Sequence, residues 1–206
     1  MIEEYSAAGI IMLITIAMSI IAFQNPKWKD IWILYPWRDY RNGKLYTLLT
    51  SGFIHADTTH LAFNMLSYYF FAFHLQDAIG PTAFTIIYLL SIVLSDIPTL
   101  LRFKKQPLYR SLGASGGVSA IVFSFIVLTV PYHQNTMLYV FFIPMPAWLF
   151  GLLYLAYSFY MSRKGGDSIN HDAHFYGALS GIALILILKP EVLKAWLYFM
   201  QNILHN

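Results

Sequence analysis

The chain has 206 residues, of which 58% are hydrophobic and 11% are charged. Soluble domains carry roughly 25% charged residues, so this composition excludes an ordinary soluble protein and indicates a single membrane domain over the whole chain. The formal net charge is +3, but the basic residues lie in loops, and we expect no nucleic-acid-binding face. The sequence contains no cysteine, which excludes disulfides, thiolate metal sites and a cysteine nucleophile.

Six apolar segments predict an all-α membrane protein with six spanning helices. We expect these spans at residues 7–23, 59–75, 82–95, 115–130, 147–162 and 174–188. The first segment lacks the basic region and the cleavage site of a signal peptide, so we expect it to be retained. Several segments are shorter than the roughly 20 residues that cross a bilayer, so they either thin the bilayer or begin below its surface.

The first connection, residues 24–58, mixes tryptophan and tyrosine with lysine and arginine. This combination is typical of the headgroup region, and long loops often carry function, so we expect a partly embedded loop. Farther along, we expect Asp96 near Pro98 to end a helix and to face water. Pro144 and Pro146 predict a short extended piece at residues 138–143 and then a helix that begins near 147.

The last segment of the chain, residues 190–205, begins with a proline and mixes apolar and polar residues. This pattern predicts an amphipathic tail helix that lies on the membrane.

Four polar side chains lie at or near the beginning of three predicted spans. His60 and Asn64 are four residues apart, so one helix face presents both. Ser115 begins the fourth span and His174 begins the sixth. Ionisable groups inside a membrane are costly and mark functional sites, so the serine and the histidine predict a hydrolase built in the membrane.

These four side chains cover the roles that acyl transfer needs. A serine hydroxyl is a weak nucleophile until a base accepts its proton, so we predict Ser115 as nucleophile and His174 as general base. The oxyanion needs hydrogen-bond donors, for which His60, Asn64 and the backbone N–H of Ser115 are candidates. The N-terminus of the fourth helix adds a favourable partial positive charge.

Glycines would let the fourth and sixth helices approach closely. The supporting glycines that bracket the serine or follow the histidine are Gly113, Gly116, Gly177 and Gly181. The last two share one helix face, and spacing of small residues by four favours close helix contact in membranes. If the two helices touch there, Ser115 and His174 come within hydrogen-bond reach.

Simpler interpretations exist for each motif. The glycine–serine segment alone is more often a helix-packing element, and His60 with Asn64 could form a structural hydrogen bond. His171, Asp172 and His174 could bind a metal, as could His55 and His60. The sequence has no His-Glu-x-x-His motif, however, and we expect neither a metal nor a cofactor.

Three segments closely resemble the rhomboid intramembrane serine proteases in order and position: HLAFN at 60–64, GASG at 113–116 and AHFYGALSG at 173–181. The resemblance covers nearly the whole chain and implies a six-helix rhomboid-like bundle with a half-embedded first loop. It implies a dyad of Ser115 and His174 without aspartate, and it assigns the oxyanion hole to residues 60 and 64.

The chain departs from the pattern of this family at two places. Tyr46 and Thr47 stand where a Trp-Arg pair is common, which removes the stabilising arginine. Ser119 stands one turn after the nucleophile, where some members have a tyrosine that packs against the catalytic histidine. We therefore expect Tyr176 or another aromatic residue to orient His174. His55 matches a further histidine that is common in the family.

The resemblance implies an intramembrane serine endopeptidase that cleaves single-span membrane proteins through an acyl-enzyme. Its substrates would enter laterally from the lipid bilayer past the fifth span. The alternative is a catalytically silent rhomboid-like protein that binds membrane helices for quality control. An intact Ser115 and His174 favour the protease, and the sequence does not predict an oligomeric state.

The family usually keeps its N-terminus in the cytoplasm with the active site opening outward, and we expect this orientation in the cell's inner (plasma) membrane. On this orientation only Lys189 and Lys194, of the 13 lysine and arginine residues, lie inside. The positive-inside rule favours the reverse orientation.

Overall fold

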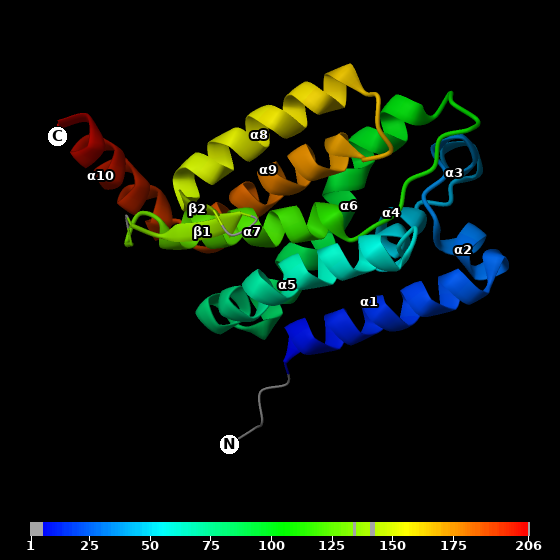
Figure 1. Cartoon of the computed structure of the whole chain (residues 1–206), viewed down its shortest axis with the longest axis horizontal. Helices are drawn as coiled ribbons and strands as arrows, with labels where there is room; N and C mark the ends of the chain where they lie inside the picture. The colour runs from blue at the N-terminus through cyan, green and yellow to red at the C-terminus, as the bar shows by residue number, and fades with distance from the viewer. Residues whose placement is uncertain (1–5, 134, 141–142, 206) are drawn as a thin grey trace.

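Long helices joined by short helices and one hairpin make up the molecule (Figure 1). The computed structural model describes residues 6–133, 135–140 and 143–205. The long helices of this part are α1 (Ala7–Gln24), α5 (Thr58–Ile79), α6 (Pro81–Phe103), α7 (Ser115–Thr129), α8 (Ala147–Lys164) and α9 (His171–Leu188). The other elements are α2 (Pro26–Trp32), α3 (Pro36–Asn42), α4 (Thr47–Thr50), the 3-10 helix η1 (Ser51–Phe53), β1 (Met137–Val140), β2 (Ile143–Pro146) and α10 (Glu191–His205).

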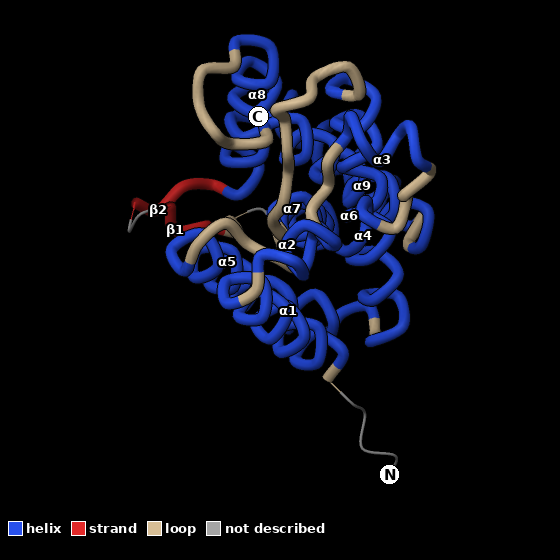
Figure 2. The backbone as a smooth tube through the Cα atoms, turned by 90° about the vertical axis from the view of Figure 1, so that its right-hand side faces the viewer, coloured by secondary structure: helices blue, strands red, loops and turns tan. Residues whose placement is uncertain are grey.

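Helix α7 lies at the centre of the bundle because it is apolar all round. Residues 116–124 are all buried, and α7 contacts α5, α6, α8 and most extensively α9. In Figure 1, α1 and α5 run side by side along one edge, α8 runs along the other, and α7 and α9 lie between. Figure 2 shows the same order from the end of the bundle, with α8 farthest from α1.

Each predicted span coincides with a helix. Only some of these helices have the length and hydropathy needed to cross a membrane. In the described part of the chain, α1, α6 and α9 are long and apolar enough to cross a bilayer. Helix α7 is apolar but has only 15 residues. These helices agree with a membrane protein, and the count of six spans stays a prediction.

The third long helix corrects the expectation for Asp96. Helix α6 continues through Pro98 to its end at residue 103, because a membrane helix tolerates a proline where neighbouring helices surround it. Asp96 therefore lies inside the helix, only 7% exposed, and accepts a hydrogen bond of 3.0 Å from Ser51 Oγ. The prediction that it faces water is wrong, because the end of the first connection covers it.

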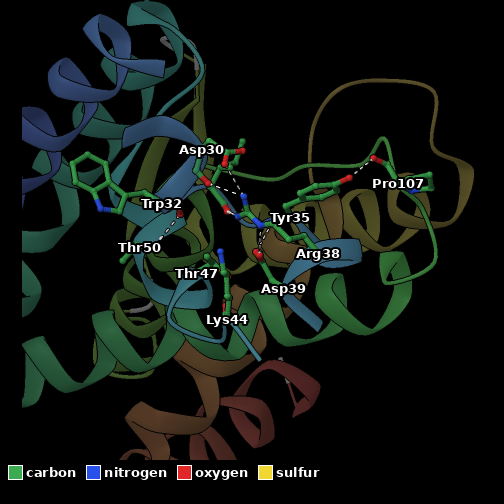
Figure 3. Close-up of polar contacts among 10 residues, drawn as sticks. Asp30, Trp32, Tyr35, Arg38, Asp39, Lys44, Thr47, Thr50 and Pro107 are labelled. Atoms are coloured by element: carbon green, nitrogen blue, oxygen red, sulfur yellow. Dashed lines mark hydrogen bonds and ion pairs between the residues drawn. The ribbon is translucent and has the colours of Figure 1, made fainter. Parts of the chain in front are cut away.

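The first connection is folded into short helices, and Arg38 joins two of them, α2 and α3 (Figure 3). Arg38 forms ion pairs with Asp30, at 2.9 Å, and with the fully buried Asp39, at 2.7 Å. Asp39 also accepts a hydrogen bond of 2.8 Å from the backbone N–H of Tyr35. Arg38 thus stabilises this connection in a chain that has Tyr46 and Thr47 in place of the expected Trp-Arg pair.

The segment between α7 and α8 adds a small sheet to the otherwise helical fold. Strands β1 and β2 pair antiparallel, and α8 begins at Ala147 as the prolines predict. Phe141 and Phe142, within the predicted extended piece, lie outside the described residues.

The predicted tail helix is α10. Its Val192 and Phe199 are buried, and the indole N–H of Trp196 donates a hydrogen bond of 2.8 Å to the backbone oxygen of Val127 in α7. The tail is therefore docked on the bundle through one face.

Candidate active site

A cavity of about 760 Å³ opens at the end of the bundle where α5, α7 and α9 begin. The structure brings all four predicted polar side chains to this cavity: His60 and Asn64 from α5, Ser115 from α7 and His174 from α9. Residues separated by more than 100 positions in the sequence therefore share one polar space inside an apolar bundle.

Glycines bring α7 and α9 into backbone contact beside this cavity. A Cβ atom built on Gly177 would lie 2.9 Å from Gly116 Cα, and one on Gly181 would lie 2.6 Å from Ala120 Cα. Real Cβ contacts are not this short, so the two helices can lie this close only with glycine at both positions.

Two helix caps fix where α5 and α9 begin, and so place His60 and His174 beside the cavity. Asp57 caps α5, since its carboxylate accepts the backbone N–H of His60 at 2.8 Å. Asn170 caps α9, which begins at residue 171, and accepts the N–H of Ala173 at 3.1 Å. His60 and His174 therefore lie in the first turns of their helices.

Two backbone N–H groups of the loop before Ser115 donate hydrogen bonds to the end of the first connection. The N–H of Gly113 donates to the oxygen of Ser51 at 3.0 Å, and the N–H of Ala114 donates to His55 Nε2 at 3.3 Å. On the other side of its ring, His55 Nδ1 lies 2.9 Å from Ser19 Oγ in α1. His55 thus links α1 to the residue before Ser115, a role that the sequence alone did not reveal.

His60 is oriented so that one ring nitrogen can donate into the cavity. Its ring lies on Gly113, where φ is +126° and a Cβ atom would lie 2.7 Å from His60 Cε1. Nδ1 accepts a long hydrogen bond of 3.5 Å from the N–H of Ala56, which assigns the ring proton of the neutral form to Nε2.

Asn64 and the start of α7 supply further donors. One amide hydrogen of Asn64 donates to the oxygen of His60 at 3.0 Å, and the second remains for another acceptor. The first N–H groups of a helix have no carbonyl partner within the helix, which applies to Ser115 at the start of α7. Three donors therefore line the space around the serine.

Ser115 and His174 lie at the same cavity without a direct bond between them. Within the described residues, no hydrogen bond joins Ser115 Oγ to the His174 ring. Catalytic hydrogen bonds are often long in unliganded enzymes and shorten when substrate binds.

An aromatic residue of α8, not Tyr176, contacts the ring of His174. The rings of Tyr154 and His174 are nearly parallel, with centroids 6.3 Å apart and planes 16° apart. Tyr176 packs instead on Phe175, with centroids 5.4 Å apart. The expectation for Tyr176 is wrong, because a residue two positions along α9 projects to another side of the helix.

The residues of the metal alternative have other partners. Asp172 accepts hydrogen bonds from Arg102, at 2.8 Å, and from Ser162, at 2.5 Å. His171 Nε2 lies 3.0 Å from Asp167 Oδ2. In the described residues, no three His, Asp or Glu side chains gather as metal ligands would.

The buried His55 predicts a loss of stability in acid. Burial, helped by the nearby His60 ring, lowers the pKa of His55 to about 3. The unfolded chain binds this proton near pH 6.5, so stability is complete above that pH and decreases as the pH falls towards 3. At 1.36 kcal/mol per pKa unit, we expect a loss of about 2 kcal/mol between pH 7 and pH 5.

Thermal unfolding of the wild type and of His55→Gln at both pH values measures this contribution. Glutamine can still accept the N–H of Ala114 but does not titrate, so its unfolding temperature should depend less on pH. His133→Gln, at an exposed position, should keep the wild-type dependence. An equal pH dependence in all three proteins would contradict the role of His55.

Comparison with known proteins finds one family. The model of the Rhomboid domain matches residues 42–191. The chain is 31% identical over 156 residues to the RHOMBOID-like protein 12, mitochondrial, of Arabidopsis thaliana. This alignment covers 68% of this chain and 45% of the plant protein. It is 29% identical over 150 residues to a Bacillus subtilis protein provisionally named rhomboid protease YdcA, covering 69% of this chain and 67% of the relative.

A third relative is the Rhomboid protein 1, mitochondrial, of Saccharomyces cerevisiae, which is 28% identical over 148 residues. The alignment covers 70% of this chain and 42% of the yeast protein. The chain therefore spans less than half the length of the plant and yeast relatives.

Proposed function

The chain belongs to the rhomboid family, and on this premise we propose that it is an intramembrane serine endopeptidase. The observation that carries the proposal is the convergence of Ser115, His174, His60 and Asn64 on one cavity. A protein that only binds membrane helices would need no nucleophile, base and oxyanion donors at the same place.

In the proposed reaction, Ser115 Oγ attacks the carbonyl carbon of the scissile bond while His174 accepts its proton. The carbonyl oxygen becomes an anion beside His60 Nε2–H, the free amide hydrogen of Asn64 and the N–H of Ser115. The C–N bond then breaks, and His174 donates its proton to the leaving amine. A water molecule, deprotonated by His174, then attacks the ester of Ser115. The acyl–oxygen bond breaks, His174 returns the proton to Ser115 Oγ, and the carboxylate product leaves.

The proposed substrates are single-span membrane proteins that reach the cavity from the bilayer. A helical substrate hides its carbonyl groups in hydrogen bonds, so it must unwind before Ser115 can attack. We propose that it enters past α8, whose outer face exposes Leu152, Leu153 and Tyr157. Helix-weakening residues near the cleavage site should therefore favour cleavage.

Reconstitution in lipid vesicles with a model single-span substrate tests this function. We expect cleavage at one bond within or near the membrane, which gives two products. We also expect a fluorophosphonate to label Ser115. A substrate that binds but stays intact, with no labelling, would instead indicate the silent helix-binding alternative.

Asn64→Ala should lower the rate without abolishing it, because two other oxyanion donors remain. Loss of one donor typically costs about 10²–10³ in kcat. Cleavage kinetics should show this decrease with a nearly unchanged KM. Asn42→Ala, at an exposed position in α3, serves as the control and should keep the wild-type rate. A wild-type kcat in Asn64→Ala would remove this residue from the oxyanion hole.

The protein is an integral membrane protein, and its membrane and orientation belong to the proposal. Two relatives are named as mitochondrial proteins, so the comparisons give no support to the predicted plasma membrane. We keep the orientation usual for the family, with the active site opening away from the compartment of the N-terminus.

A further inference from the structure

Among the described residues, no carboxylate bonds to the His174 ring, whereas a carboxylate fixes the imidazole in many serine proteases. The nearest pairing of that kind joins Asp167 to His171, one turn before His174. Packing must therefore orient the His174 ring, which the ring of His171 meets edge-on with centroids 5.8 Å apart. The ring of Tyr154 stacks on this imidazole and lines the same cavity.

A hydrogen bond to the helix of the nucleophile holds Tyr154 in this place. Tyr154 Oη and Ser119 Oγ are 2.6 Å apart, and Ser119 is only 4% exposed. The buried hydroxyl group of Ser119 needs a partner, and the hydroxyl group of Tyr154 supplies it. Ser119 follows Ser115 by four residues, so the anchor and the nucleophile lie on one face of α7.

Packing on two further rings restrains Tyr154 from α7 and from its own helix. The ring centroids of Phe123 and Phe150 lie 5.4 Å and 5.7 Å from that of Tyr154. The small side chain of Ser119 leaves the space that this tyrosine ring occupies. The aromatic support thus comes from α8, although α7 has no aromatic residue one turn after the nucleophile.

We propose that Tyr154, anchored by Ser119, is the positioning residue that orients the imidazole of His174 towards Ser115. The proposal rests on the proposed function, in which His174 is the general base. It links the base on α9, the nucleophile on α7 and the outer helix α8 through one ring. The orientation of the base therefore depends on the position of α8.

Tyr154→Leu and Tyr154→Phe test the proposal in the full chain reconstituted in vesicles. Leucine removes the ring, so kcat and the rate of fluorophosphonate labelling should both fall about tenfold, the scale of one aromatic pair, while KM stays the same. Phenylalanine keeps the ring and should recover most of both rates. Ser119→Ala should match Tyr154→Phe, and the double variant should be no slower than either, because both changes remove one hydrogen bond.

Tyr160→Leu, at an exposed position on the same helix, is the matched control and should keep wild-type rates. Tyr154→Met decides the question if the leucine variant does not fold, since methionine fills the volume without a ring. Unchanged kcat and labelling in Tyr154→Leu or Tyr154→Met would overturn the positioning role. A change in KM alone would overturn it too, because it would indicate substrate access. A wild type that neither cleaves nor labels would instead contradict the proposed function.

Discussion

We expect Ser115→Ala to abolish cleavage of a single-span substrate in reconstituted vesicles, and His174→Ala to do the same. Removing the nucleophile or the base of a serine protease costs on the order of 10⁶ in kcat, because the two groups act in one step. For the same reason the double variant should be no slower than either single variant. Product analysis by mass spectrometry and labelling by a fluorophosphonate measure the loss.

A second serine of the same cavity provides the control for this experiment. Ser67 lies on α5, lines the cavity and is exposed, and Ser67→Ala should cleave and label as the wild type does. Cleavage at the wild-type rate by Ser115→Ala, or labelling that persists in it, would exclude the proposed mechanism. Thermal unfolding of each variant shows that the fold is intact.

Gly177→Ala should destabilise the protein and reduce its activity together. The new Cβ atom would lie 2.9 Å from Gly116 Cα, so α7 and α9 must separate. Overpacking of this kind costs about 1–3 kcal/mol or more, which exceeds the roughly 1 kcal/mol that alanine gains over glycine in a helix. Separation also moves Ser115 away from His174, and a misplacement of about 1 Å can cost about 10² in rate.

The matched control is a glycine of α8 with room for a methyl group. A Cβ atom on Gly151 would meet its nearest neighbour, the ring of Phe123, at 3.5 Å, which is an ordinary contact. Gly151→Ala should therefore unfold at the wild-type temperature or slightly above it, in a thermal scan in detergent. The same unfolding temperature and cleavage rate for Gly177→Ala and the wild type would show that the helix contact is not tight.

Local patterns in the sequence predicted the helices well. Helix α1 begins at the predicted residue, and α8 begins directly after Pro146, because apolar runs and prolines act over a few neighbouring residues. The largest departure is α6, which continues past Pro98 and buries Asp96. Helix α5 also ends four residues later than predicted, at Ile79, and α9 begins three residues earlier, at His171. The sequence pattern could not show the burial of Asp96, because it depends on Ser51, which is 45 positions away.

For the candidate site too, the sequence predicted one part and only the structure showed the other. The residue types and their spacing nominated Ser115, His174, His60 and Asn64, since acyl transfer needs a nucleophile, a base and donors whatever the fold. The groups that hold them in place were not evident from the sequence. His55 bonds to the N–H of Ala114, a residue 59 positions farther along the chain, and no local pattern marks such a pair.

The sequence by itself determined the class of the protein, the helices and the residues that carry the proposed chemistry, because each depends on composition or on spacing within one helix. The tertiary structure alone decided which side chains surround those residues. Ser119 had indicated a missing aromatic support, yet it bonds to Tyr154, 35 positions away on α8, which stacks on His174. Contacts between helices depend on how the whole bundle packs, so only the folded chain specifies them.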